Sequence, residues 1–366
     1  MAEPSAIDHA IDDLRVVLPA LLRSMEALVF VARHLNPPEV AAAIRAANPA
    51  EVELRTARPR LDEWPERVAG LREPLGAASD AALAAFDALG EARDLRGVFG
   101  ALRFLPRAEE ALFPLAPALA PVSRYFLDPP SRGDEDLQVR LSGAESSDQT
   151  GVFHVDHENG ARGGFSIYVP QYYKPDRAWP LVMALHGGSG NGRAFLWSWL
   201  AAARSAGAIL VAPTAVGETW ALMGDDVDTP NLTRILAVVA NRWRIDPGRR
   251  LLTGMSDGGT FTYISGLEVG SPFTHLAPVA AAFHPMLAGM AEPERVRGLP
   301  IHVVHGAVDW MFDVELARQA RRALEAAGAA VAYSEIADLS HCYPREVNRE
   351  LLSWLQATPS PQTSAG

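Results

Sequence analysis

The sequence predicts a chain of two parts, an all-helical region followed by a mixed α/β domain whose mostly parallel sheet carries helices on both faces. Three observations predict this division. Apolar residues recur at helical spacing through residues 1–127, whereas strand and helix patterns alternate after residue 150. The second part opens with two strand patterns joined by a short turn, which is typical of an antiparallel hairpin. The length of 366 residues also favours two domains over one.

Residues 1–127 are predicted to form a helical domain of unknown role. The first helix follows from six apolar residues spaced three or four apart: Ile11, Leu14, Leu18, Leu22, Met25 and Leu28. Further helical patterns cover residues 39–47, 61–71, 77–89 and 108–113. Prolines at positions 37, 38, 49, 59, 65, 74, 106, 114, 117 and 121 are expected to end these helices and leave short connections.

The remaining chain is predicted to form the α/β domain, residues 151–358. Residues 128–150 are polar and rich in Ser, Asp and Gly, which predicts a linker or an irregular edge strand, and residues 359–366 are expected to be a flexible tail. The opening hairpin is expected to turn at residues 158–163. Strands are expected at 181–185, 209–212, 250–255, 276–282, 301–304 and 331–335, and helices at 194–206, 232–242, 257–269, 313–327 and 345–355. This alternation is typical of a mostly parallel sheet covered on both faces.

Composition excludes several classes of protein. The net charge of −11 argues against nucleic-acid binding, because a phosphate-binding face needs a basic surplus. No apolar run approaches the roughly 20 residues of a membrane span, and the acidic N-terminus does not resemble a signal peptide. The single cysteine, Cys342, rules out an intrachain disulfide and fits a reducing compartment. We therefore expect a soluble, cytoplasmic protein.

The stretch GMSDGG places Ser256 between glycines, directly after a predicted strand and before a predicted helix. A strand that turns straight into a helix has little room for side chains, and Gly254 and Gly258 remove Cβ atoms where the two elements approach. Ser256 would then stand on a strained, exposed bend, as the nucleophile does in the elbow of a G-x-S-x-G motif. The simpler alternative is a serine in an ordinary turn.

A serine nucleophile needs a base and a group that orients the base, and both are expected at the carboxyl ends of other strands. Asp309 follows the strand pattern IHVV, and His341 follows the last strand pattern, VAYSEI. The chain order Ser256, Asp309, His341 is that of nucleophile, acid and base in one known arrangement of the triad. Asp338 is an alternative acid, although it lies in the same loop as His341. His305 is an alternative base, although a structural histidine is more usual at the end of a buried strand.

The glycine-rich segment LHGGSGNG follows another predicted strand and is a candidate oxyanion hole. The backbone N–H groups of Gly188 and Asp257 are expected to converge on one oxygen. No lysine follows these glycines, so the segment does not fit a phosphate-binding loop. A flexible turn is the simpler alternative.

From about residue 160 to 357 the sequence resembles serine esterases of the α/β-hydrolase superfamily, and within it the phospholipase/carboxylesterase group and the polyhydroxybutyrate-depolymerase and feruloyl-esterase-like proteins. The motifs that carry the resemblance are YVP, LHGGSGN, VAPTA, GMSDGG, HGAVD and LSHCYP. The resemblance implies an α/β-hydrolase fold and makes residues 151–358 the catalytic domain, with a triad of Ser256, Asp309 and His341. It implies an oxyanion hole formed by Gly188 and Asp257. It does not cover the helical N-terminal third, and the aspartate after the nucleophile departs from the glutamine or alanine often found there.

Trp220 and Trp310 are candidates for the wall of a substrate pocket, with core packing as the alternative. His284 is a further candidate for the cleft, with a structural role as the alternative. The segment HVDH, residues 154–157, lacks a further partner for a metal, so neither a metal nor another cofactor is expected. The acidic loop of Glu218, Asp225, Asp226 and Asp228 is expected to be solvated, and it would disfavour anionic substrates if it bordered the cleft.

These features predict a serine hydrolase that cleaves small-molecule carboxylic esters through an acyl-enzyme. A peptidase or a thioesterase would use the same residues, because fold and triad do not fix the leaving group. The alternative from another class is a non-catalytic interaction protein built on a hydrolase scaffold. The helical domain is a candidate lid, or a surface through which a homo-oligomer forms.

Overall fold

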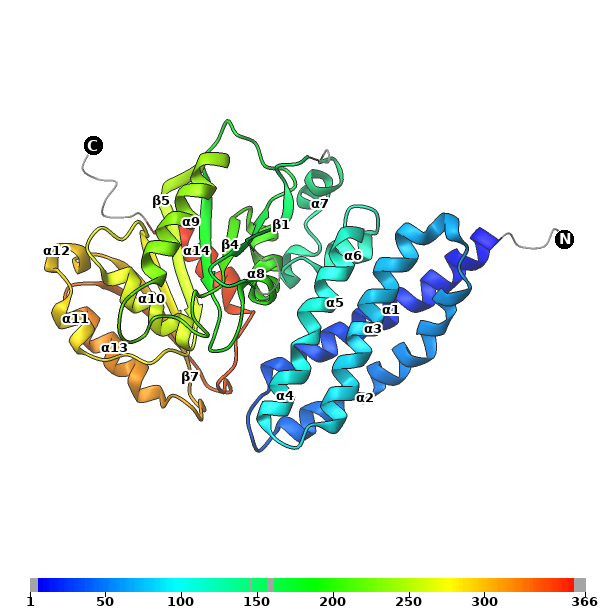
Figure 1. Ribbon diagram of the computed structural model, residues 1–366, viewed down its shortest axis with the longest axis horizontal. Helices are drawn as coiled ribbons and strands as arrows, with labels where there is room; N and C mark the ends of the chain where they lie inside the picture. Colours follow the sequence, from blue (N-terminus) through cyan, green and yellow to red (C-terminus); the bar gives the residue numbers. More distant parts are fainter. Residues whose placement is uncertain (1–5, 145–146, 157–160, 359–366) are drawn as a thin grey trace. The chain divides into compact units, whose positions relative to one another are not determined.

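The computed structural model describes residues 6–144, 147–156 and 161–358. Contacts between Cα atoms divide the chain into two compact units, Met1–Phe126 and Leu127–Gly366. The first unit is helical and coloured blue to cyan in Figure 1, and the second contains the sheet.

The first unit is a bundle in which α1 packs against α2 and α3, and α3 packs against α4 and α5. Its helices are α1 (Ala6–Arg33), α2 (Val40–Ala57), α3 (Ala69–Glu91), α4 (Leu95–Leu102), α5 (Phe104–Leu112) and α6 (Ala120–Tyr125), with short 3-10 turns η1 (Arg58–Glu63), η2 (Glu66–Val68) and η3 (Phe113–Leu115). The expected stripe on α1 is buried at Leu18, Met25 and Leu28, whereas Ile11 is exposed. An apolar face at helical spacing therefore forms the core of the bundle.

The helix expected over residues 61–71 is wrong. The η1 turn ends at Glu63, and Trp64 and Pro65 are extended, with ψ of 137° and 153°. A residue that precedes proline is driven out of the helical region by the proline ring, which explains the break at Trp64. The indole of Trp64 is buried, and its Nε1–H donates to Asp13 Oδ2 over 3.3 Å.

Prolines 49 and 74 were expected to end helices, and both lie inside them, in α2 and α3. A proline inside a helix costs about 3 kcal/mol, because it removes one hydrogen bond and clashes with the preceding turn. Both helices continue because buried residues flank each proline: Ala47 and Leu54 in α2, and Leu75 and Ala78 in α3. Burial of the shared face outweighs the local cost.

The second unit is built on one eight-stranded sheet with the order β1-β2-β4-β3-β5-β6-β7-β8 within the described residues. The strands are β1 (Gly151–Val155), β2 (Phe165–Val169), β3 (Trp179–Leu185), β4 (Ile209–Pro213), β5 (Ile245–Met255), β6 (His275–Val279), β7 (Pro300–Gly306) and β8 (Ala330–Ile336). Strand β2 is antiparallel to both β1 and β4, and the pairs from β4 to β8 are parallel. The six parallel strands are those that the sequence predicted.

Helices cover both faces of the sheet (Figure 1). Helix α8 packs against β2, β3, β4 and α14, whereas α10 packs against β5 and β6, and α13 against β7 and β8. The helices of this unit are α7 (Glu135–Ser142), α8 (Gly192–Ala206), α9 (Asp228–Arg242), α10 (Asp257–Leu267), α11 (Met286–Met290), α12 (Pro293–Val296), α13 (Val314–Ala326) and α14 (Val347–Ala357). The strands β2, β3, β4, β6 and β7 are buried almost throughout, as expected for a sheet covered on both sides.

Residues 128–150 do not form the expected linker or edge strand where the structure describes them. They contain the 3-10 turn η4 (Pro129–Ser131) and helix α7. The Asp134 side chain caps α7 by accepting the N–H of Leu137 over 2.9 Å. Leu137 and Leu141, one helical turn apart, are buried together with Leu127 against Tyr172. An apolar pair at this spacing was the signal for a short helix in an otherwise polar segment.

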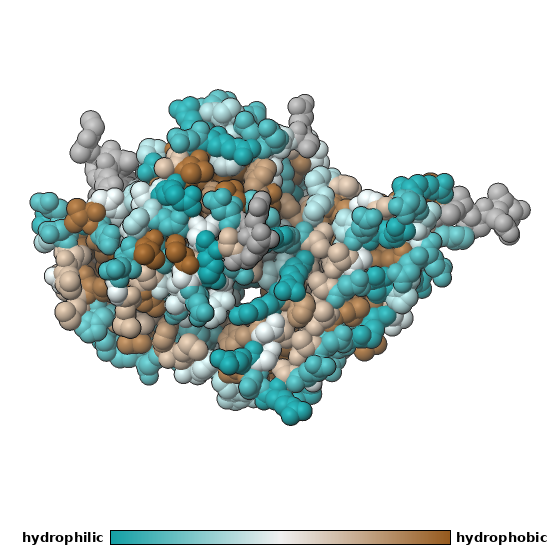
Figure 2. Space-filling view, viewed as in Figure 1, coloured by the Kyte–Doolittle hydropathy of each residue, from teal (hydrophilic) through white to brown (hydrophobic). Residues whose placement is uncertain are grey.

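Two further expectations concern residues outside the described ranges. The tail at 359–366 lies outside them, and so do residues 158–160 of the hairpin turn expected at 158–163. None of the described helices is both long and apolar enough to cross a membrane. On the face of the molecule shown in Figure 2, hydrophilic residues predominate and hydrophobic residues occur in separate patches.

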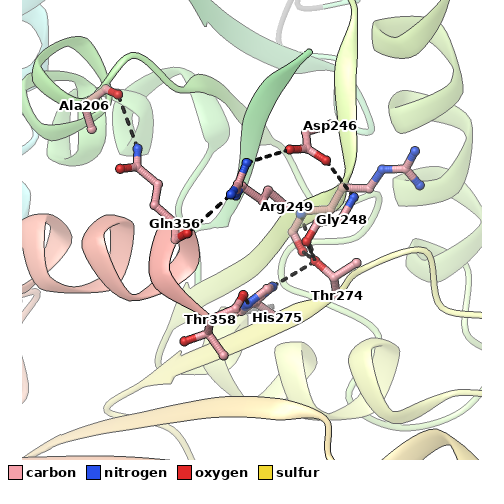
Figure 3. A network of polar contacts seen from close by, with 9 residues as sticks. Ala206, Asp246, Gly248, Arg249, Thr274, His275, Gln356 and Thr358 are labelled. Atoms are coloured by element: carbon pink, nitrogen blue, oxygen red, sulfur yellow. Dashed lines mark hydrogen bonds and ion pairs between the residues drawn. The ribbon is translucent and has the colours of Figure 1, made fainter. Parts of the chain in front are cut away.

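A network of polar contacts ties the end of α14 to β5 and β6 (Figure 3). Arg249 donates to Asp246 over 3.0 Å and to the carbonyl of Gln356, and the Gln356 amide donates to the carbonyl of Ala206. The Nε2–H of His275 donates to the carbonyl of Thr358 over 3.0 Å. These contacts join α14, β6 and the end of α8 at the edge of the sheet opposite the loops that carry Ser256, Asp309 and His341.

Acid is expected to destabilise this unit through His275. Burial lowers the pKa of His275 from 6.5 to about 4, so the folded chain holds a neutral ring where the unfolded chain takes up a proton. Stability from this group is therefore complete above pH 6.5 and is lost as the pH falls towards 4. In His275→Gln, the free energy of unfolding in urea should fall less between neutral and acidic pH than in the wild type. The control His284→Gln replaces an exposed histidine and should follow the wild type, whereas parallel curves for His275→Gln and the wild type would contradict the assignment.

Candidate active site

Ser256 lies on a tight bend between β5 and α10. Its backbone has φ 55° and ψ −118°, a strained conformation for a residue with a side chain. A Cβ on Gly254 would come within 2.4 Å of the Gly258 backbone, and a Cβ on Gly258 within 2.5 Å of two carbonyl oxygens, so both positions require glycine. The Ser256 N–H donates to the carbonyl of Val279 over 3.0 Å, which fastens the bend to β6. The sequence motif and the strained backbone therefore agree on an elbow, although Ser256 is buried, with 8% of its surface exposed, and does not stand on the exposed bend that the sequence predicted.

The structure brings Ser256, His341 and Asp309 together from three loops. His341 Nε2 lies 3.0 Å from Ser256 Oγ, and His341 Nδ1 lies 2.9 Å from Asp309 Oδ2. Asp309 follows β7 and His341 follows β8, and the loops are joined by the hydrogen bond from the Val308 N–H to the Leu339 carbonyl over 3.2 Å. The three side chains thus form one hydrogen-bonded chain at the carboxyl ends of parallel strands.

Neither the alternative acid, Asp338, nor the alternative base, His305, is part of the hydrogen-bonded chain of Ser256, His341 and Asp309. Asp338 is exposed and the His341 Nδ1 bond goes to Asp309. His305 is buried, with Nε2 2.8 Å from the carbonyl oxygen of Phe312 and 3.5 Å from Asp309 Oδ2. Asp313, rather than Asp309, caps α13, because its side chain accepts the N–H of Glu315 over 2.8 Å.

The environment of Asp309 keeps it ionised at neutral pH. Burial raises the pKa of this carboxyl, but hydrogen bonds from His341 and from the N–H groups of Phe312 and Met311 outweigh burial and hold the pKa below its usual value. The two backbone N–H groups donate to Oδ1 over 2.8 and 2.9 Å, which leaves Oδ2 towards His341. An ionised carboxylate in this position fixes the His341 tautomer with its hydrogen on Nδ1 and its lone pair towards Ser256.

The two predicted oxyanion donors lie on adjacent segments. Asp257 is the first residue of α10, and a Cβ on Gly188 would lie 2.8 Å from Asp257 Oδ2, so the glycine loop runs directly against this side chain. No hydrogen bond to the N–H of Gly188 or Asp257 occurs within the described ranges, which leaves both donors available. The Thr219 hydroxyl donates to Asp257 Oδ2 over 2.6 Å. Sequence reasoning missed Thr219, because nothing local marks a loop threonine as the partner of a residue 38 positions away.

His186 anchors the glycine loop beneath these donors. Its Nδ1–H donates to the Gly187 carbonyl over 2.7 Å, and its Nε2 accepts the N–H of Ala215 over 3.1 Å. Burial lowers the pKa of His186 to about 4, so the ring is neutral near pH 7 and its Nε2 lone pair is available. Arg162 adds a second connection, because its guanidinium donates to the carbonyls of Ala215, Gly190 and Glu218. The glycine loop and the loop after β4 are thus held as one rigid piece.

The three candidates for substrate contact differ in placement. Trp220 is 2% exposed, stacks on Phe261 and donates its Nε1–H to the His186 carbonyl over 2.7 Å. This packing and the hydrogen bond to the glycine loop correspond to the core role that the sequence left open as the alternative to a pocket wall. Trp310 is 41% exposed, with its ring centroid 6.2 Å from that of His341. His284 is exposed on the loop after β6, where its Nδ1 accepts the N–H of Met286 over 3.2 Å.

The acidic loop after β4 is only partly solvated. Asp228 is fully buried and accepts the N–H groups of Val216 and Ala221, each over 2.8 Å, and burial raises its pKa. It therefore shapes the loop that carries Thr219 and Trp220. No group of three His, Cys, Asp or Glu side chains placed to hold a metal occurs among the described residues, and His157 of the HVDH segment lies outside them.

The strand order, the antiparallel second strand and the elbow after β5 define an α/β-hydrolase fold, as the sequence predicted. No protein-family model matches the chain. It is 30% identical over 156 residues to XynS20E, a bifunctional acetylxylan esterase/xylanase of Neocallimastix patriciarum, a stretch that covers 42% of this chain and 22% of that protein's length. This match confirms the expected resemblance to esterases, whereas the placement in the phospholipase/carboxylesterase group stays a prediction.

Several solved structures are similar to this chain. A thermostable esterase shares 22% identity at a TM-score of 0.47, with 58% of this chain and 64% of that chain covered. FphF, a fluorophosphonate-binding serine hydrolase of Staphylococcus aureus, shares 14% at a TM-score of 0.48, with 57% and 98% covered. A ferulic acid esterase shares 16% at a TM-score of 0.47, with 56% and 96% covered.

Proposed function

We propose that the second unit is a serine hydrolase that cleaves carboxylic esters through an acyl-enzyme. Ser256 is the nucleophile, His341 the general base and acid, and Asp309 the group that orients the imidazole. The observation that supports this most directly is the continuous path from Asp309 Oδ2 to His341 Nδ1, at 2.9 Å, and from His341 Nε2 to Ser256 Oγ, at 3.0 Å. A serine hydroxyl is a weak nucleophile alone, and this path supplies the base that it needs.

In the first half of the reaction, Ser256 Oγ attacks the ester carbonyl carbon while His341 Nε2 takes the hydroxyl proton. The carbonyl oxygen becomes an anion, and the N–H groups of Gly188 and Asp257 are the proposed donors to it. The tetrahedral intermediate then collapses, the bond to the alcohol oxygen breaks, and His341 gives its proton to that oxygen. The alcohol leaves, and the acyl group remains on Ser256.

In the second half, His341 takes a proton from water, whose oxygen attacks the acyl carbon. A second tetrahedral intermediate collapses to the carboxylic acid, and the proton on His341 returns to Ser256 Oγ. Throughout, the low pKa of Asp309 keeps its carboxylate charged beside the imidazolium that forms in each half.

Acetyl esters are the first substrate class to examine, because the relative XynS20E is an acetylxylan esterase in name and 30% identical over the matched stretch. Apolar side chains are exposed in segments that follow the carboxyl ends of β4, β6 and β7, in loops at Val216, Val308, Trp310 and Met311 and in α11 at Met286 and Met290. These residues favour an ester with an apolar or aromatic group next to the scissile bond.

The choice between esterase, thioesterase and peptidase is tested with matched substrates. The three substrates are p-nitrophenyl acetate, an acetyl thioester and p-nitroacetanilide. We expect the oxygen ester to give the highest kcat/KM. A higher value for the amide would favour a peptidase, and a higher value for the thioester a thioesterase. Absence of turnover on all three by the folded chain would favour the non-catalytic alternative.

The role of the helical unit stays a prediction. Control of access to the site and formation of a homo-oligomer are the two roles expected of it. The cytoplasmic location rests on the single, buried cysteine and is likewise a prediction.

A further inference from the structure

His305 occupies a buried position at the end of β7, beside the carboxylate of Asp309. The side chain of His305 is 1% exposed and that of Asp309 is 0% exposed, so both are shielded from bulk solvent. His305 Nε2 lies 2.8 Å from the carbonyl oxygen of Phe312. A carbonyl oxygen only accepts, so Nε2 carries a hydrogen. A hydrogen on Nδ1 would find no acceptor within the described residues, which favours the same tautomer.

The same Nε2 also lies 3.5 Å from Asp309 Oδ2, although its hydrogen bond goes to the Phe312 carbonyl. Oδ2 is the oxygen that accepts from His341 Nδ1 at 2.9 Å, whereas Oδ1 is occupied by the N–H groups of Met311 and Phe312. Oδ2 therefore lies between two imidazoles, one on the side of Ser256 and one on the side of the sheet. Because β7 is a buried strand paired on both sides, with β6 and β8, the second imidazole is a rigid support.

The contact with Phe312 fixes the other end of the same loop. Phe312 donates its N–H to Asp309 Oδ1, and its ring packs edge-on against His341 with 5.1 Å between ring centroids. By holding the Phe312 carbonyl, His305 limits the movement both of the carboxylate and of the ring that packs against the His341 imidazole. Without the His305–Phe312 hydrogen bond, the side of the loop that carries Phe312 would be held mainly by the hydrogen bonds to Asp309 within the same loop.

We infer that His305 is a positioning residue whose Nε2–H holds the Phe312 carbonyl and, through that loop, keeps the Asp309 carboxylate in register with His341. It acts through Asp309 and not on substrate. The inference rests on the proposed function, in which the Asp309–His341 pair drives proton transfer. Small displacements of such a pair lower the rate steeply, by up to about a hundredfold for a shift of about 1 Å.

Two substitutions of similar size separate the hydrogen bond from packing. In His305→Gln the side-chain amide reaches about as far as Nε2 and keeps a donor for Phe312, whereas His305→Met fills the space without a donor. We expect His305→Met to lower kcat on p-nitrophenyl acetate by about tenfold or more with KM little changed, because proton transfer and not binding is affected. His305→Gln should recover most of that loss.

The rate is expressed per active site, counted by fluorophosphonate labelling, so that a merely unstable variant is not mistaken for a slow one. The far-downfield proton resonance of the Asp309–His341 hydrogen bond should be kept in His305→Gln and be shifted or lost in His305→Met. Equal kcat per labelled site in His305→Met and the wild type would overturn the inference, and so would equal losses in both variants. If Ser256→Ala remained active, the proposed function itself would fail, whereas an inactive Ser256→Ala with an unaffected His305→Met would remove the inference alone.

Discussion

Ser256→Ala removes ester turnover, with an expected loss of about 10⁶ in kcat, the size found when the nucleophile of a serine protease triad is replaced. The hydroxyl that forms the acyl-enzyme is absent, and His341 Nε2 loses its partner at 3.0 Å. The fold should persist, because the strained backbone of residue 256, at φ 55°, is no more costly for alanine than for serine. The measurement is kcat on p-nitrophenyl acetate, together with circular dichroism and a thermal melt.

Ser265→Ala is the matched control for this substitution. Ser265 is buried in α10, the helix that starts just after the elbow, so the same chemical change is made in the same element. Activity of this variant should stay near that of the wild type. Turnover by Ser256→Ala within about a hundredfold of the wild type would show that the reaction does not use this serine.

Asp309→Asn is expected to lower kcat by about 10³ to 10⁴, because the amide imposes the wrong tautomer on His341. The hydrogen bonds around residue 309 determine the orientation of the asparagine amide. The N–H groups of Met311 and Phe312 point at Oδ1, so the amide oxygen takes that position and the NH₂ group takes the position of Oδ2. The NH₂ group then donates to His341 Nδ1, which moves the imidazole hydrogen to Nε2 and removes the lone pair that accepts the Ser256 proton.

The control for this variant is Asp338→Asn, which changes an exposed acid in the loop of His341. It should alter kcat by no more than about twofold, since surface substitutions away from a site have small effects. If Asp338→Asn were inactive and Asp309→Asn active, Asp338 would be the acid of the site. In the wild type, the Asp309 carboxyl has a pKa below its usual value. Protonation of Asp309 should therefore lower activity only at a pH below the range in which free carboxyl groups titrate.

The sequence predicted the positions of those candidate site residues that directly follow a strand. Ser256, Asp309 and His341 each follow a strand with a clear apolar pattern, and parallel strands bring their carboxyl ends to one edge. The need for glycine at positions 254 and 258 was also predictable, because a tight turn from strand to helix excludes Cβ atoms. Both the fold class and the grouping of the three side chains were therefore predictable from local patterns.

Other parts depended on contacts between distant segments, which no local pattern encodes. Trp220 has the sequence context of a pocket residue, yet its indole is buried beneath the glycine loop by its bond to His186. The Thr219–Asp257 bond joins two loops 38 residues apart. Prolines 49 and 74 remain inside helices because tertiary burial outweighs a local penalty, a balance that the sequence alone does not reveal.

The most direct test of the account is covalent labelling of the intact protein with a fluorophosphonate, read by mass spectrometry, with Ser256→Ala alongside. We predict a single adduct on the wild type, located by peptide mapping on Ser256, and none on the variant, because only a serine activated by its own histidine reacts at an appreciable rate. An unlabelled but folded wild type, or an adduct that persists in Ser256→Ala, would contradict the assignment of Ser256 as an activated nucleophile.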